Sequence, residues 1–148
     1  MDNVQNKQKR DGGFTLVELA IVIVIIGVLA AFGVPRFRDS VERSKASEAF
    51  SYLSSVRSAQ ERYHGRAGTY AADLTKLDVQ LPTPKYFEAS AVVANGASLE
   101  KGWKVTLTRK GASAGYGEYT VIYTEEGFDA TSTVADADHE AINPMSQG

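Results

Sequence analysis

The sequence contains no cysteine, so a disulfide framework and a thiolate metal site are both excluded. It has only two histidines, His64 and His139, and they lie too far apart in the chain to suggest a zinc site. An excess of basic charge is missing as well, because 16 basic and 18 acidic residues give a net charge of −2. This balance disfavours a nucleic-acid-binding domain.

Catalytic motifs are also missing. No Cys-His or Ser-His-Asp spacing appears in the chain. The glycine-rich segment GASAGYG, residues 111–117, follows a strand pattern, and no helix pattern comes after it, so the context of a phosphate-binding loop is absent. We therefore expect neither an enzyme nor a cofactor.

What the chain does have is a long apolar run near its amino terminus. Residues 14–35 carry a single charged side chain, Glu18. At about 1.5 Å per residue, a helix over this run matches a bilayer core about 30 Å thick. The alternative is a secretory signal peptide, because Lys7, Lys9 and Arg10 precede the run. A carboxylate in the apolar core costs up to about 3 kcal/mol in membrane insertion, which argues against that alternative.

Residues 12–37, GGFTLVELAIVIVIIGVLAAFGVPRF, resemble the amino-terminal signature of the type IV pilins and of the pseudopilins of type II secretion. The resemblance implies a leader, residues 1–13, that prepilin peptidase removes by cutting after Gly13. It also implies methylation of the new amino terminus on Phe14. Glu18 then becomes the fifth residue of the mature chain, and Pro35 matches the proline at which the family's helix bends.

The same resemblance gives Glu18 a partner, the amino terminus of a neighbouring subunit in a filament. Physically, a charge in a medium of low dielectric constant is tolerated only when it is paired, so a subunit inserted with the wrong stagger is penalised. Gly27, Gly33 and Pro35 are weak points of the helix. We expect the segment between Gly27 and Pro35 to melt in part in the filament.

The pattern that follows predicts an amphipathic helix over residues 37–66, continuous with the membrane-spanning helix over residues 14–36. The helix is expected to end at Gly65 or Gly68. Apolar or small residues recur at helical spacing and should face a domain: Ala46, Ala49, Phe50, Leu53, Val56 and Tyr63. The charged side chains expected on the outer face are Glu42, Lys45, Glu48, Arg57 and Arg62.

A connecting loop, residues 67–85, is expected to hold a short helical turn at residues 72–77, and strand patterns occupy residues 86–134. Alternation places Phe87, Ala89, Ala91 and Val93 on one face, then Trp103, Val105 and Leu107, then Tyr119, Val121 and Tyr123, then Phe128, Ala130 and Ser132. An antiparallel sheet with one apolar face must be covered, and the amphipathic helix supplies the cover. The fold class is α+β, a long helix packed on three or four antiparallel strands, which is also the pilin architecture.

The carboxyl-terminal tail, residues 135–148, has alternating acidic residues, Asp136, Asp138 and Glu140. They suggest either a calcium site, as in major pseudopilins, or a solvated acidic surface. The spacing of an EF-hand is absent, which favours the solvated surface. Many pilins staple this region with a disulfide, which a chain without cysteine cannot form, so another contact must hold the tail.

Three functions are compatible with these features of the sequence. The first is a pilin that polymerises through its amino-terminal helix, and the second is a pseudopilin of a short periplasmic filament. The third is a single-span membrane enzyme or sensor. The resemblance implies as partners further copies of the chain, prepilin peptidase and the assembly platform in the bacterial inner membrane. It also implies an inner-membrane precursor and an extracellular pilus or a periplasmic pseudopilus.

Overall fold

The computed structural model describes residues 12–79 and 82–146. Most of the predicted leader, residues 1–11, therefore lies outside the described residues, as do two residues of the connecting loop and the last two of the tail. The chain divides into two units, Met1–Arg36 and Phe37–Gly148.

One helix, α1, runs from Leu16 to Ala67 and passes through Pro35. It ends where Gly68 takes a φ of 72° and donates its backbone N–H to the carbonyl of His64 at 2.8 Å. Glycine adopts this left-handed conformation at no steric cost, which makes it the usual residue just past a helix end. Of the two glycines expected to stop the helix, Gly68 does so, and Gly65 lies within the last turn.

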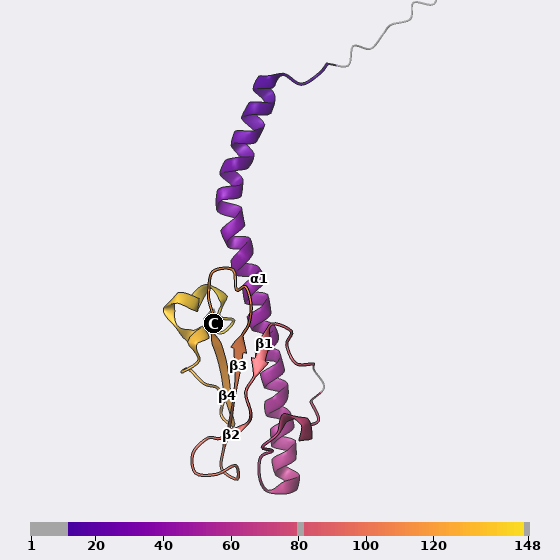
Figure 1. The fold of residues 1–148 in the computed structure, drawn as a ribbon, viewed down its shortest axis with the longest axis vertical. Helices are drawn as coiled ribbons and strands as arrows, with labels where there is room; N and C mark the ends of the chain where they lie inside the picture. Colours follow the sequence, from indigo (N-terminus) through magenta and orange to yellow (C-terminus); the bar gives the residue numbers. More distant parts are fainter. Residues whose placement is uncertain (1–11, 80–81, 147–148) are drawn as a thin grey trace, which may run out of the picture. The chain divides into compact units, whose positions relative to one another are not determined.

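A five-stranded antiparallel sheet forms the second layer. Its strands are β1 (Phe87–Ala89), β2 (Val93–Ala94), β3 (Trp103–Arg109), β4 (Thr120–Thr124) and β5 (Gly127–Phe128). The order is β1-β3-β4-β5, with β2 also paired to β3, and Figure 1 shows β1, β3 and β4 beside the second half of α1. Three 3-10 helices complete the unit: η1 (Leu74–Lys76), η2 (Thr133–Ala135) and η3 (Ala137–Ile142).

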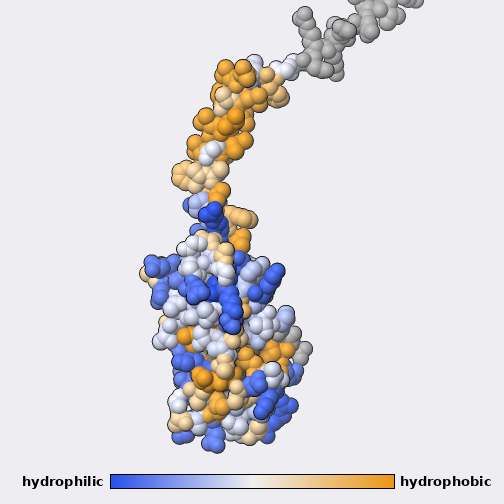
Figure 2. All heavy atoms as spheres, viewed as in Figure 1, coloured by the Kyte–Doolittle hydropathy of each residue, from blue (hydrophilic) through white to orange (hydrophobic). Residues whose placement is uncertain are grey.

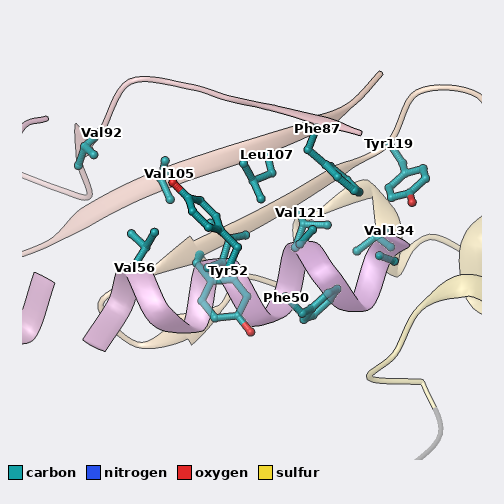
Figure 3. Packing of buried hydrophobic residues seen from close by; sticks show 14 of the residues in the cluster. Phe50, Tyr52, Val56, Phe87, Val92, Val105, Leu107, Tyr119, Val121 and Val134 are labelled. Carbon is teal, nitrogen blue, oxygen red and sulfur yellow. The ribbon is translucent and has the colours of Figure 1, made fainter. Parts of the chain in front are cut away.

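The core lies between α1 and the sheet, as the periodicities predict. Figure 3 shows Phe50 and Val56 of α1 facing Val105, Leu107 and Val121 of β3 and β4. In β3 the buried positions alternate strictly from Trp103 to Arg109. Because each fully buried aliphatic or aromatic side chain contributes about 1.5–3 kcal/mol, this interface is the main source of the domain's stability.

The strand predicted through Phe87 and Val93 is interrupted. Ala89 pairs with Leu107 and Val93 pairs with Lys104, so three residues of one segment stand opposite two of β3. The Ser90 hydroxyl accepts the N–H of Thr106 at 3.1 Å in place of a backbone carbonyl. This extra residue shifts the alternation, and the prediction that Val93 faces the core is wrong: Val92 is buried and Val93 is exposed.

The strand predicted through Phe128 and Ser132 is shorter than expected and ends at Phe128. The carboxylate of Asp129 accepts the backbone N–H of Thr131 at 2.8 Å, which closes a turn. The hydroxyl of Ser132 then accepts the N–H of Ile122 at 2.9 Å. A side-chain oxygen thus takes the place of a backbone carbonyl at the edge of β4.

The tail is held by packing and by hydrogen bonds. Val134 and Ile142 are fully buried, and a ring nitrogen of His139, Nε2, lies 3.0 Å from the carbonyl oxygen of Tyr116. The Tyr116 hydroxyl donates to Asp39 of α1 at 2.7 Å. Burial, and then this bond, raise the pKa of Tyr116 to about 12, so the phenol remains a donor at neutral pH. These contacts hold the tail against the rest of the globular unit in a chain that has no cysteine to form a disulfide.

Gly102 occupies a position that has no room for a side chain. A Cβ there would lie 2.6 Å from Oε1 of Glu125 and 2.7 Å from the carbonyl oxygen of Asn95. The Glu125 carboxylate is itself fixed, because it accepts the N–H of Trp103 at 3.0 Å and the amide of Asn95 at 2.9 Å.

We predict that Gly102→Ala lowers the free energy of unfolding by about 1–3 kcal/mol, because a rigid backbone carbonyl must move. Urea unfolding of the detergent-solubilised chain, followed by the fluorescence of its single tryptophan, measures the change. Gly65→Ala is the control, since it adds a methyl group in open space on a helix and should stabilise by up to about 1 kcal/mol. An equal effect of the two substitutions would contradict the steric argument.

Candidate assembly and processing site

The first turn of α1 is closed by a reciprocal pair of side chains, Thr15 and Glu18. The Glu18 oxygen Oε2 accepts the backbone N–H of Thr15 at 2.8 Å and the Thr15 hydroxyl at 2.9 Å. The Thr15 hydroxyl in turn accepts the backbone N–H of Glu18 at 3.2 Å. This is a capping box, which satisfies two backbone donors that the helix leaves without partners. The T-x-x-E spacing was visible in the sequence, but our sequence analysis did not use it.

The cap uses only one of the two carboxylate oxygens of Glu18. Within the described residues, Oε1 accepts no hydrogen bond, and Glu18 forms no ion pair. The box therefore fixes the side chain at the start of the helix and leaves one oxygen able to accept from a cation. A carboxylate with that geometry is a ready partner for an ammonium group.

The predicted cleavage position lies just before the cap. Gly12, Gly13 and Phe14 have no regular secondary structure and are exposed, and the side chain of Phe14 is 84% accessible. A Cβ at Gly13 would meet nothing within 4 Å, so no contact with the described residues requires glycine there.

The first part of α1 exposes apolar side chains all along its length, and Figure 2 shows them on the visible face of the segment. It is the one helix in the described part of the chain that is long and apolar enough to cross a membrane, with a mean hydropathy of 2.8 and no buried residue in its most apolar window. Such a surface needs either lipid or other apolar helices around it.

The predicted weak points lie within this helix. Gly27 and Gly33 are helical and exposed, and Pro35 leaves the carbonyl one turn before it without a backbone donor. The helix nevertheless continues through all three residues.

A buried charged cluster, which our sequence analysis missed, ties α1 to the sheet. Glu42 was expected on the outer face of the helix, and this is wrong: its exposed fraction is 0%, and that of Arg109 at the end of β3 is 1%. Arg109 Nη2 donates to Glu42 Oε2 at 3.1 Å, and the Tyr119 hydroxyl donates to Oε1 at 3.0 Å. Lys45 adds an ion pair at 3.2 Å. The spacing of Glu42 from Ala46 and Ala49 on the buried face was the available signal.

The cluster makes stability depend on acid pH. Burial alone would raise the pKa of Glu42, but hydrogen bonds from Arg109, Tyr119 and Lys45 outweigh it and lower the pKa in the folded chain. Ionised Glu42 thus contributes stability above its unfolded pKa of about 4.3, and this is lost as the pH falls through the lower folded value.

We predict that the free energy of unfolding falls less steeply below about pH 4.3 in Glu42→Gln than in the unchanged chain. Urea unfolding at a series of pH values, followed by the fluorescence of Trp103, measures the two slopes. Glu48→Gln, at an exposed position of the same helix, is the control and should keep the original slope. Equal slopes for all three chains would contradict a role of Glu42 in acid stability.

The acidic residues of the tail do not assemble into a metal site in the described part of the chain, where no group of three or more ligating side chains comes together. Asp136 lies just before η3, and Asp138 and Glu140 lie within it, all three exposed.

Comparison with known proteins agrees with the helix and its motif. Residues 8–34 match the family model of the prokaryotic N-terminal methylation motif. The chain is 39% identical over 87 residues to the fimbrial protein EcpC of Eikenella corrodens, covering 58% of this chain and 57% of that protein. It is 40% identical over 67 residues to the type IV major pilin protein PilE of Neisseria gonorrhoeae, covering 45% and 40% of the two chains.

A third relative, the type IV major pilin protein PilA of Myxococcus xanthus, is 44% identical over 62 residues, which cover 42% of this chain and 28% of that protein. The matched segments thus span from 28% to 57% of the length of these three relatives. The fold agrees with the sequence evidence, because a long apolar amino-terminal helix packs on an antiparallel sheet. Over part of its length the chain is therefore similar to fimbrial proteins and type IV major pilins, and it carries the methylation motif near its amino terminus.

Proposed function

We propose that this protein is a structural subunit of a type IV pilus, made as a membrane precursor and polymerised through its amino-terminal helix. The single observation that carries the proposal is the carboxylate of Glu18. The capping box holds this side chain in place, and its second oxygen accepts no hydrogen bond from the described residues. The carboxylate lies at the start of a helix whose apolar surface is exposed.

Cleavage after Gly13 creates an ammonium group on Phe14 of each subunit. In a filament, the Glu18 carboxylate of an incoming subunit accepts a hydrogen bond from the ammonium group of a neighbour. Because the surrounding helices and lipid have a low dielectric constant, a subunit with the wrong stagger would bury both charges unpaired. The ion pair therefore selects one register, while the apolar side chains supply the area of contact.

Each part of the chain has its role in this proposal. Residues 1–13 form the leader, residues 14–36 the assembly helix and residues 37–66 its amphipathic extension. Residues 67–85 connect the helix to the sheet region, residues 86–134, and residues 135–148 form the tail. Local melting between Gly27 and Pro35 would accompany packing in the filament, since this segment has weak helix formers and a missing hydrogen bond.

The proposed partners are prepilin peptidase, the assembly platform of the inner membrane and further copies of the chain. The precursor would reside in the inner membrane and the polymer outside the cell. A chain that is abundant in filaments sheared from the cell surface fits this proposal. A chain confined to the cell envelope would fit the short periplasmic filament of a pseudopilin.

We predict that Gly13→Ala slows conversion of the precursor to the mature chain, because the added methyl group hinders binding by a peptidase that recognises glycine at this position. Immunoblots of whole cells should show precursor accumulating, with sheared filaments reduced in proportion. Gly12→Ala, one residue earlier in the same exposed segment, is the matched control. A Gly13→Ala chain that stays uncut and still forms normal filaments would contradict the need for a free amino terminus.

A further inference from the structure

A groove on the globular unit combines exposed apolar and cationic groups. It lies between α1 and the segment before β1, and is lined by Val41, Ser44, Lys45, Glu48 and Tyr86. Val41 is 38% exposed and Tyr86 is 37% exposed, so two large apolar side chains of a folded domain meet solvent at one place.

Lysines surround the exposed aromatic ring of this groove. Lys45 Nζ lies 4.6 Å and Lys85 Nζ 5.7 Å from the centre of the Tyr86 ring. Lys110 donates its backbone N–H to the Tyr86 carbonyl at 2.8 Å, which brings a third lysine to the same edge. Three acidic side chains lie here: Glu48 lines the groove, Glu88 forms an ion pair with Lys110, and buried Glu42 forms an ion pair with Lys45. Lys85 is the lysine of this group that forms no ion pair with any described residue. We call this surface the Tyr86 groove.

The carboxyl-terminal quarter of the chain has the opposite charge. Residues 111–148 contain no lysine or arginine. Four exposed carboxylates of this segment form no ion pair with any described residue: Glu118, Asp136, Asp138 and Glu140. The Tyr86 groove lies at the β1 edge of the sheet, and η3 lies on the β4 side in Figure 1.

We propose that the Tyr86 groove of one subunit receives the acidic η3 segment of a second copy of the chain. This inference rests on the proposed polymer. The two surfaces are different patches of one molecule, so their contact is head-to-tail. Repetition of a head-to-tail contact builds an open helical array when the rotation between copies does not close a ring, whereas a patch that pairs with itself closes a dimer. Complementary charge at the rim then fixes the register of the globular units, while the helices provide the main contact.

The absence of cysteine makes the contact testable by cross-linking. Ser44 lines the groove, Ala141 lies in η3, and both are exposed. Sheared filaments of the Ser44→Cys/Ala141→Cys chain should give a ladder of disulfide-linked multimers on mild oxidation. Each single variant should give no ladder. Filaments of the double variant that form normally but stay monomeric after oxidation would overturn the proposal.

Charge reversal gives an independent test. Lys85→Glu and Glu140→Lys should each reduce the filament yield, relative to processed subunit in the membrane, by about tenfold, since like charges facing each other cost a kcal/mol or more. The combination of the two should restore most of the yield. Lys101→Glu reverses an exposed charge outside the groove and is the control. Lys45 is left unchanged because it also pairs with buried Glu42.

The outcomes separate the docking proposal from the proposed function. If the unchanged chain forms no filament, the proposed function fails and the docking proposal fails with it. If filaments form but the charge reversals match the Lys101→Glu control, the docking proposal alone is overturned.

Discussion

Glu18→Ala should leave the precursor in the membrane and cut normally, yet lower the yield of filaments by more than about tenfold, because an ammonium group buried without its partner costs several kcal/mol. The yield is measured as subunit in the sheared fraction relative to processed subunit in the membrane. Cleavage should be unaffected since Glu18 lies five residues after Gly13.

Alanine removes both the helix cap and the charge, so two further variants are needed to separate them. Glu18→Gln keeps an amide oxygen that can accept the Thr15 donors but has no charge, and it should fail almost as severely as alanine. Thr15→Ala removes the side chain that shares the capping box and should cost about 1 kcal/mol of helix stability with little effect on filament yield. A normal yield from Glu18→Gln would show that the cap, and not ion pairing, is what filaments require.

Arg109→Met should be the most damaging single change in the globular unit, lowering its free energy of unfolding by about 3–5 kcal/mol. Methionine fills much of the space, but the carboxylate of Glu42 stays buried at 0% exposure without its principal partner. The loss is measured by urea unfolding of the solubilised chain, with the buried side chain of Trp103 as the fluorescent probe.

The double variant Glu42→Met/Arg109→Met should recover much of that stability, because replacing both members of a buried pair by apolar groups is often neutral. Lys110→Ala, which breaks the exposed pair between Lys110 and Glu88, is the control and should cost less than about 1 kcal/mol. If Arg109→Met costs no more than Lys110→Ala, the cluster does not hold α1 to the sheet.

The elements with a clean period could be predicted from the sequence. The alternation from Trp103 to Leu107 and the helical spacing of Ala46, Ala49 and Leu53 describe faces that must be buried, and the structure buries them. The long helix and the two-layer fold follow from these faces alone. The type of fold thus depends on patterns that a single sequence displays.

The errors arose where side chains replace backbone partners or partners lie far apart in sequence. Ser90 and Ser132 use their hydroxyls as hydrogen-bond acceptors, which breaks or ends a predicted strand, and periodicity carries no sign of this. Glu42 was placed outside because a carboxylate is usually solvated. Its partner Arg109 is 67 residues away, so only the folded chain could bring them together.

The candidate site, like the fold, could be predicted from the sequence only in part. The motif around Gly13 and Glu18 could be recognised in the sequence. The coordinates were needed to show that Oε2 of Glu18 caps the helix while Oε1 accepts no hydrogen bond from the described residues. Because one oxygen caps the helix, the side chain is held in place before any neighbour arrives.

The most direct test of this account is the intact mass and amino-terminal sequence of the chain in filaments sheared from the surface of its native cell. We expect an abundant chain that begins at Phe14 with a methylated amino group. A chain that begins at Met1, or one cut near Ala31 as a secretory signal would be, would contradict it. In either case the ammonium group that Glu18 is proposed to bind would not exist at Phe14.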